Sequence, residues 1–256
     1  MSQSYTTIEL SVHDQVATLT LNRPDSRNAL NLLMCQELTQ ACKQLSQDKM
    51  VNVVLIEAKG SSFCAGADLK ERQTMSTADL VARRIEGFTA YAAIEALPMP
   101  VIAVVQGPAF GSGAEIIAAC DFVLASDQAC VKYPEVGWGT VGATQRLPRI
   151  VGRRMAKELL FSGRVVDAQE AHKLSLFNHV YTPEDLSTQA HAMAQAIAKC
   201  NPLTTRLTKR SIDQGLDTTR EGAMGVELLA IQENLQGSDW KSAIAKFGQT
   251  ASPVKP

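Results

Sequence analysis

The sequence lacks the features that mark several large classes of protein. Its 256 residues carry a formal net charge of −1, and the basic residues are scattered apart from short clusters. This balance gives no electrostatic reason to expect nucleic acid or an anionic membrane as the main partner. No apolar run approaches the ~20 residues of a membrane span, and the N-terminus lacks the pattern of a secretory signal. We therefore expect a cytoplasmic protein without a membrane or nucleic-acid partner.

Disulfide and metal patterns are also missing. The six cysteines form no CxxC pair and lie mostly within apolar runs, while the four histidines neither cluster with them nor form HExxH. We interpret the cysteines as reduced core thiols, in preference to disulfides or metal ligands, and expect no metal. The cysteines are Cys35, Cys42, Cys64, Cys120, Cys130 and Cys200.

What the sequence does contain is a strand and helix pattern over a chain that is 45% apolar, enough for a large core. Alternating residues predict two strands around the turn at 13–15, and helical spacing predicts an amphipathic helix over 29–46. Short strands follow at 51–58, 100–107, 121–126, 129–134 and 177–181, with helices near 152–162 and after Asp167, where Asp167 and Glu170 have the form of a capping box.

The pattern changes after Pro183, because residues 184–247 are nearly all helical in spacing. The sequence therefore predicts an α/β protein with a strand and helix core over 1–183 and a helical region over 184–256. Helices with apolar faces at the end of a chain either pack on another subunit or cover their own core.

Two segments share one plan. "VVLIEAKGSSFCAGADL" and "VIAVVQGPAFGSGAEII" each read as a strand, a glycine, a loop, and small residues where a helix begins. The first turn of a helix has unpaired N–H groups, which small residues let a ligand approach closely. Side by side, two such turns could direct two N–H groups at one oxygen, as an oxyanion hole requires. For either segment taken alone, the alternative is that its glycines only fit the tight turn at the start of a helix, without any ligand.

Two glutamates are candidates for acid and base chemistry. Glu115 lies at the start of the apolar run "GAEIIAACDFVLA", where a carboxylate needs hydrogen bonds or a raised pKa. Glu135 follows a strand and a proline in "VKYPEVGWG". The pair is a hypothesis for general acid/base catalysis. The alternative is a helix-dipole contact for Glu115 and a surface loop position for Glu135.

Four stretches make the chain similar to a known family. "SSFCAGADLKE", "GPAFGSGAEIIAACDFVLAS", "VKYPEVGWGTVGATQRLPRIVG" and "AKELLFSGRVVDAQEAHKLSLFNHV" resemble the enoyl-CoA hydratase/isomerase (crotonase) superfamily, and the likeness covers most of the chain. The resemblance implies a spiral core of ββα turns, a C-terminal helical region used in trimerisation, and a homotrimer or hexamer. It also implies an acyl-CoA thioester substrate and no separate cofactor, since coenzyme A is part of that substrate.

The resemblance also assigns site residues by position. Ala67 and Ser112 fall on the two N–H donors of the oxyanion hole, and Glu115 and Glu135 on the two catalytic glutamates. In the implied reaction water adds across the C2=C3 bond of a 2-enoyl-CoA, with Glu115 deprotonating the water and Glu135 protonating C2. The positions implied to contact the acyl-CoA are Ala65, Leu69, Lys70, Trp138 and Phe247.

Other activities of the same family remain open. A Δ3,Δ2-isomerase, a dehydratase and a hydrolase all pass through a similar enolate, and a catalytically weak acyl-CoA-binding protein is a further alternative. A double-bond isomerase needs chiefly Glu135, so a second glutamate at 115 favours a hydratase.

The sequence departs from the family pattern at four places, one of which is Thr250, where some members carry a second lysine that contacts coenzyme A. Ser112 stands where glycine is usual, so a positive φ there would strain the chain by roughly 1 kcal/mol, whereas a negative φ leaves its N–H available. The segment 139–146 is shorter than is common, and Trp138 either restricts acyl length there or is an ordinary core or rim residue. Ser175 replaces a helix-ending glycine.

Overall fold

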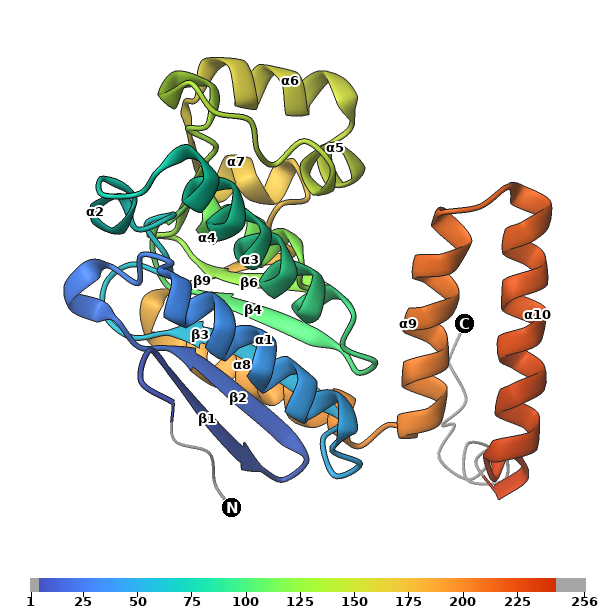
Figure 1. Ribbon diagram of the computed structural model, residues 1–256. Coiled ribbons are helices and arrows are strands. Elements are labelled where there is room, and N and C mark those ends of the chain that lie inside the picture. The colour runs from blue at the N-terminus through green and yellow to red at the C-terminus, as the bar shows by residue number, and fades with distance from the viewer. Residues whose placement is uncertain (1–4, 243–256) are drawn as a thin grey trace. The chain divides into compact units, whose positions relative to one another are not determined.

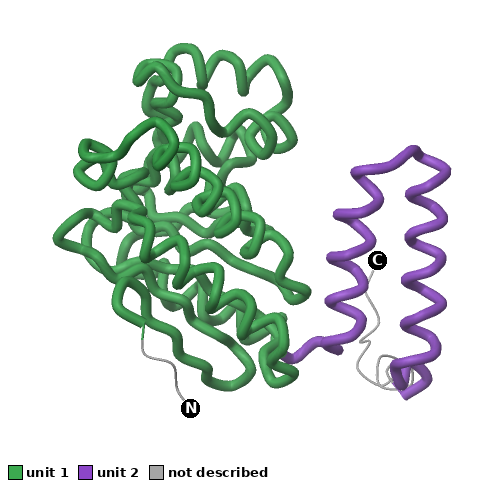
Figure 2. Tube along the Cα trace, in the orientation of Figure 1, with its two compact units in different colours: residues 1–198 green, residues 199–256 purple. Residues whose placement is uncertain are grey.

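The structure, a computed structural model, describes residues 5–242. Contacts divide the chain into two compact units, residues 1–198 and 199–256 (Figure 2). This division falls one helix later than the predicted boundary at 183/184, because the helix Pro183–Ala198 packs against the sheet of the first unit. No helix among residues 5–242 is long and apolar enough to cross a membrane.

A six-stranded sheet forms the frame of the first unit, in the order β1-β2-β3-β4-β6-β9. All neighbouring pairs are parallel except the β1-β2 hairpin, which confirms the turn predicted at 13–15. A smaller sheet has the order β5-β7-β8. The strands are β1 Ile8–His13, β2 Val16–Leu21, β3 Val53–Ala58, β4 Val101–Val105, β5 Ala109–Phe110, β6 Phe122–Ser126, β7 Cys130–Lys132, β8 Val165–Asp167 and β9 His179–Tyr181.

Helices cover both faces of the larger sheet (Figure 1). Successive side chains of a strand point to opposite faces, so Val54 and Ile56 of β3 join the core under α1, whereas Val53 and Leu55 join the core under α8. Strands buried on both faces are apolar throughout, as β4 is. The helices of this unit are α1 Leu32–Gln47, α2 Leu69–Arg72, α3 Thr77–Glu95, α4 Ser112–Ala118, α5 Arg146–Val151, α6 Arg153–Ser162, α7 Ala168–Lys173 and α8 Pro183–Ala198, with 3-10 turns at Pro24–Ser26 and Val136–Trp138.

Two helix starts differ from the prediction. Helix α1 begins at Leu32 and not at 29, because the Asn31 side chain caps it by accepting from Met34 N at 3.0 Å. The carboxylate of Asp167 accepts from Glu170 N at 2.8 Å, which is half of the predicted capping box. The other half is absent because the Glu170 carboxylate pairs with Arg164 at 2.6 Å.

Helix α3 has no counterpart in the expectations from sequence. Its buried face carries Arg83, Gly87 and Ala90, whereas its large apolar residues Val81 and Ile85 are exposed. The usual correspondence between apolar spacing and a buried face is therefore inverted in the first half of this helix, whereas Tyr91 and Ile94 are buried in its second half. A signal was present at its start, where Ser76 and Asp79 form a complete capping box.

The second unit is a pair of helices, α9 Pro202–Leu216 and α10 Arg220–Gly237, which confirms the helical pattern predicted there. Leu207 and Ala230 are their only buried residues within the described part of the chain. Leu203 and Val226 are half-buried, and the other large apolar side chains of the two helices are exposed, namely Ile212, Leu216, Met224, Leu228, Leu229, Ile231 and Leu235. The helices therefore do not enclose a core of their own.

Asn28 ties the first loop to the loop that follows β3. Its side chain is fully buried, accepts from Arg23 N at 2.8 Å, and donates to the carbonyl oxygens of Lys59 at 2.8 Å and Ser62 at 2.9 Å. Its backbone lies in the left-handed region, with a φ of 52°, which asparagine tolerates better than most residues.

We expect Asn28→Ala to lower the free energy of unfolding by about 2–4 kcal/mol, because two buried carbonyls lose their donor and alanine is strained at this φ. Denaturant unfolding measures the change. Asn22→Ala is the matched control, since that amide makes one exposed hydrogen bond to Glu9, and it should cost no more than about 0.5 kcal/mol. Equal losses in the two variants would contradict the assignment.

Candidate active site

The loops that leave β3 and β4 are joined to each other, as the shared plan of the two segments predicted. Cys64 N donates to Pro108 O at 3.1 Å, and Phe110 N donates to Cys64 O at 2.9 Å. Glycine is required for this contact, because a Cβ on Gly113 would lie 2.4 Å from the Cys64 oxygen. The two helix starts therefore lie side by side.

The peptide before Ala67 directs its N–H away from the protein interior. The Gly66 oxygen accepts from Leu30 N at 2.8 Å, and the N–H of a trans peptide points opposite to its C=O. A Cβ built on Gly66 would lie 4.0 Å from Ser112 N, so the second candidate donor is close by. No acceptor within residues 5–242 takes a hydrogen bond from the N–H of Ala67 or Ser112.

Ser112 carries no backbone strain. It is the first residue of α4, and the positive φ of 49° falls on Gly111 before it. The strained alternative for Ser112 is therefore wrong, and its N–H is available where the first turn of the helix leaves it unpaired. Ser112 and the buried Tyr91 both line the cavity described next.

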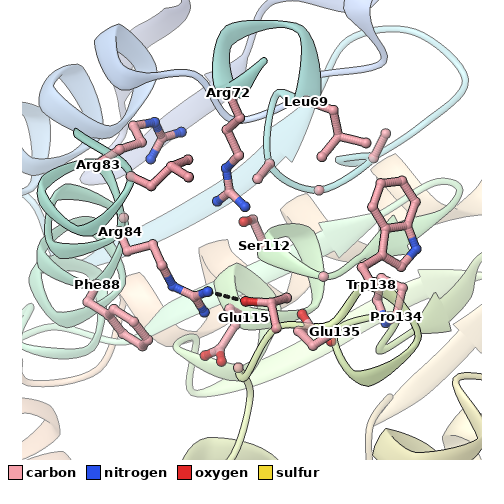
Figure 3. Close-up of a pocket in the computed structure, with 18 of the residues that line it drawn as sticks. Leu69, Arg72, Arg83, Arg84, Phe88, Ser112, Glu115, Pro134, Glu135 and Trp138 are labelled. Atoms are coloured by element: carbon pink, nitrogen blue, oxygen red, sulfur yellow. Dashed lines mark hydrogen bonds between the residues drawn. The ribbon is translucent and has the colours of Figure 1, made fainter. Parts of the chain in front are cut away.

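A cavity of about 460 Å³ adjoins both N–H groups. Most of the predicted site residues line it, and Figure 3 shows the labelled ones around a common space. Lys70 is exposed and does not line the cavity, while Phe247 and Thr250 lie outside the described residues. The predicted residues that line it are Ala65, Ala67, Leu69, Ser112, Glu115, Glu135 and Trp138.

Glu115 is buried but well partnered. Its Oε2 lies 3.3 Å from Arg146 Nη1, and Arg146 also pairs with Glu95 at 2.6 Å. Burial raises the pKa of Glu115, whereas the charge of Arg146 and a hydrogen bond from the Ala143 backbone oppose the rise. The ionised form of Glu115 thus has both a cation and a donor to hold it.

Glu135 has a different environment. A Cβ on Gly142 would lie 2.9 Å from its Cγ, and one on Gly111 would lie 3.3 Å from its Oε1, so glycines make room for this side chain. Its Oε2 is buried and has no hydrogen-bond partner among residues 5–242. Burial raises the pKa of Glu135, the Glu115 carboxylate raises it further, and Arg84 opposes. The pKa of Glu135 therefore lies above its ordinary value.

The segment 139–146, which is shorter than is common in the family, lies beside the cavity. Thr140 N donates to Glu135 O at 3.0 Å, and the Arg84 guanidinium donates to the Thr140 hydroxyl and to the Val141 carbonyl. The Arg84–Thr140 bond is the dashed line in Figure 3. Trp138 is 62% exposed at the cavity wall, so it is a rim residue and not a core residue.

Comparison with known proteins identifies the family of this chain. Residues 11–254 match the enoyl-CoA hydratase/isomerase family. The chain belongs to the enoyl-CoA hydratase/isomerase family. Its predicted crotonase fold is confirmed by the crystal structure of an enoyl-CoA hydratase from Bacillus anthracis, with a TM-score of 0.93 and 32% identity, covering 97% of this chain and 98% of that one.

Curated members of the family match over the same length. A crotonyl-CoA hydratase of Syntrophomonas wolfei is 36% identical over 248 residues, covering 95% of this chain and 95% of that protein. An enoyl-CoA isomerase/hydratase of Mycosarcoma maydis is 34% identical over 248 residues, covering 92% of this chain and 90% of that protein. Both are similar to this hydratase/isomerase family member almost from end to end.

Several cavity residues of this family member were missing from the sequence prediction. They are Arg72 from α2, and Arg83, Arg84, Phe88 and Tyr91 from α3. The positions on α3 recur at helical spacing, so the pattern after the Ser76 cap could have found them. Among residues 5–242 no group of three metal-type side chains lies close enough together to hold a metal ion.

We expect Gly113→Ala to lower the free energy of unfolding by about 1–3 kcal/mol, because its Cβ meets the Cys64 backbone and forces the two loops apart. Thermal and denaturant unfolding measure the loss. Gly137→Ala is the matched control, since a Cβ there meets nothing within 4 Å and should leave stability almost unchanged. A fully stable Gly113→Ala protein would show that the contact is not restrictive.

Proposed function

We propose that the protein is a 2-enoyl-CoA hydratase, which adds water across the C2=C3 bond of an acyl-CoA thioester. One observation supports this above the others: a single cavity is lined by two unpaired N–H groups and by two buried carboxyl groups, of which Glu115 is ion-paired and Glu135 is not. Thioester polarisation requires the first pair, and the addition of water requires the second.

The N–H groups of Ala67 and Ser112 act on the thioester oxygen. When a nucleophile attacks C3, negative charge moves onto that oxygen and the C1–C2 unit becomes an enolate. Two backbone donors that already point at the cavity stabilise this charge without reorganising, and losing one such donor typically slows a reaction by about 10²–10³-fold.

The two glutamates divide the proton transfers. Glu115, which is paired with Arg146, orients the water and takes its proton as the oxygen bonds to C3. Glu135, which has no ion-pair partner among residues 5–242 and whose pKa is raised by burial, gives its proton to C2 of the enolate. Two neighbouring carboxyl groups with different partners can act as base and acid in one reaction. Return of the proton from Glu115 to Glu135 through solvent restores the starting state.

The proposal extends to the cofactor, the oligomeric state and the cellular location. The reaction consumes only water, so coenzyme A enters as part of the substrate and no separate cofactor takes part. The exposed apolar residues on α9 and α10 support burial against other copies of the chain in a homotrimer or hexamer. The six cysteines are free thiols, which supports the cytoplasmic location, although Cys200 is exposed and so differs from the predicted core position.

A double-bond isomerase is the second candidate, because Glu135 alone suffices to move a proton between C2 and C4. The partnering of Glu115 favours the hydratase. A carboxylate that is buried, ion-paired and directed into the cavity is an unnecessary cost for a reaction that does not activate water.

We expect Glu115→Gln and Glu135→Gln each to reduce hydration of 2-enoyl-CoA thioesters by about 10²–10⁴-fold, since each removes a proton-transfer group. A spectrophotometric assay of enoyl-thioester loss measures the rate. Glu158→Gln, on the exposed surface of α6 beside Arg164, is the matched control and should keep full activity.

The same variants separate the candidates. Conversion of 3-enoyl-CoA to 2-enoyl-CoA that survives in Glu115→Gln, with no hydration by the unmodified protein, would establish the isomerase instead. Binding of acyl-CoA without turnover of any enoyl-CoA would indicate that the protein binds acyl-CoA and is not an enzyme.

The raised pKa of Glu135 should also appear in the pH dependence of stability. The folded protein holds this proton at pH values where the unfolded chain, near the ordinary value of 4.5, has released it. Stability therefore falls as pH rises from about 4.5 through the folded pKa. Glu135→Gln removes this term, so its free energy of unfolding should exceed that of the unmodified protein near neutral pH, with the gap closing towards pH 4.5. A gap that does not vary with pH would contradict the assignment.

A further inference from the structure

Three arginines form a cationic part of the cavity wall. Arg72 from α2 and Arg83 and Arg84 from α3 all contribute to it, and Figure 3 shows the three side chains grouped on one side. The proposed hydration uses none of them. A hydrocarbon acyl chain would give no reason to place guanidinium groups at this wall.

Two of the three arginines have internal partners. Arg83 is 3% exposed, pairs with Glu71 at 2.8 Å, and donates to the Leu30 carbonyl. Arg84 holds the Thr140 and Val141 segment, as described above, with uncharged acceptors only. Arg83 is therefore neutralised, whereas the charge of Arg84 is not.

Arg72 is the arginine without a partner. No ion pair joins it to a carboxylate in residues 5–242, and its Nε is buried without a hydrogen-bond acceptor. The adjacent Glu71 is already occupied by Arg83 and by Leu32 N, each at 2.8 Å. Burial lowers the pKa of Arg72, and the neighbouring charges of Arg83 and Arg84 lower it further. A partly buried guanidinium in this position is costly unless a ligand supplies an anion.

The position of the wall indicates which part of the ligand bears that anion. Arg84 donates to Thr140, whose N–H bonds the Glu135 carbonyl, and Arg72 lines the same cavity as Ser112. Both arginines thus lie beside the groups that surround C1 to C3 of the thioester. Leu80 and Phe88 line the same cavity and provide apolar contact for a short run of methylenes.

We propose that the acyl group of the substrate ends in a carboxylate, so that the substrate is the monothioester of coenzyme A with an unsaturated dicarboxylic acid. Arg72 binds the free carboxylate, and Arg84 adds to the positive potential around it. A guanidinium presents two parallel N–H groups that match the two oxygens of a carboxylate. The inference rests on the proposed hydration and narrows its substrate class.

The test compares charged and uncharged substrates that share the same coenzyme A. Enoyl-CoA esters with one, two or three methylenes between C3 and a terminal carboxylate are each paired with an ester in which an isopropyl group replaces the carboxylate. We expect kcat/KM for the preferred carboxylate ester to exceed that of its isopropyl partner by roughly 10- to 100-fold. Arg72→Gln should remove most of this preference while the isopropyl esters are still hydrated, and Arg72→Lys should keep part of it.

Lys43→Gln is the matched control, because it removes the same charge from the exposed face of α1 and should leave the preference unchanged. If no carboxylate ester, whatever its number of methylenes, reacts faster than its isopropyl partner, the inference is overturned. Hydration of the isopropyl esters in that case would still support the proposed function. An equal loss for both esters in Arg72→Gln would also overturn it, and would assign Arg72 to a phosphate of coenzyme A. No hydration of any ester would refute the proposed function itself.

Discussion

The pairing of two loops through their backbones is the constraint on which the rest of the site depends. Hydrogen bonds from Cys64 to Pro108 and from Phe110 to Cys64 bring together segments that are more than forty positions apart in the chain. Side chains could not substitute for these contacts, because the backbones approach too closely for a Cβ at Gly113. Once the loops are joined, the peptide planes fix where the N–H groups of Ala67 and Ser112 point.

Buried charge is distributed unevenly around this pairing. Arg146 is shared between Glu115 and Glu95, and Arg83 is taken by Glu71, so these ions offset each other's desolvation. Glu135 and Arg72 each keep a buried polar atom without a partner in the described part of the chain. A fold usually avoids such atoms, and both of these belong to residues that line the cavity, where a ligand could complete their hydrogen bonding.

The sequence predicted the parts of the structure that depend on local chemistry. Glycines and small residues at 65–67 and 111–114 identified the two helix starts, and the positions of Glu115 and Glu135 followed from their family context. The sequence left open whether the backbone of Ser112 is strained by a positive φ. In the structure the positive φ falls on Gly111, so Ser112 is not strained. Helix α3 was missed for a physical reason: its first half buries Arg83 and Gly87 and exposes Val81 and Ile85, so apolar periodicity there describes the wrong face. The unpartnered state of Arg72 depends on tertiary contacts that no local pattern encodes.

Arg84 has two structural roles, and together they limit which substitutions the cavity wall tolerates. Its guanidinium holds the Thr140 and Val141 segment whose backbone also bonds Glu135, and its charge belongs to the wall that faces the acyl group. A mutation at Arg84 that altered ligand preference would therefore also release the acid from its position. Arg72 has no such second role. A change of the charge that meets the acyl group is accordingly less constrained at Arg72 on α2 than at Arg84 on α3.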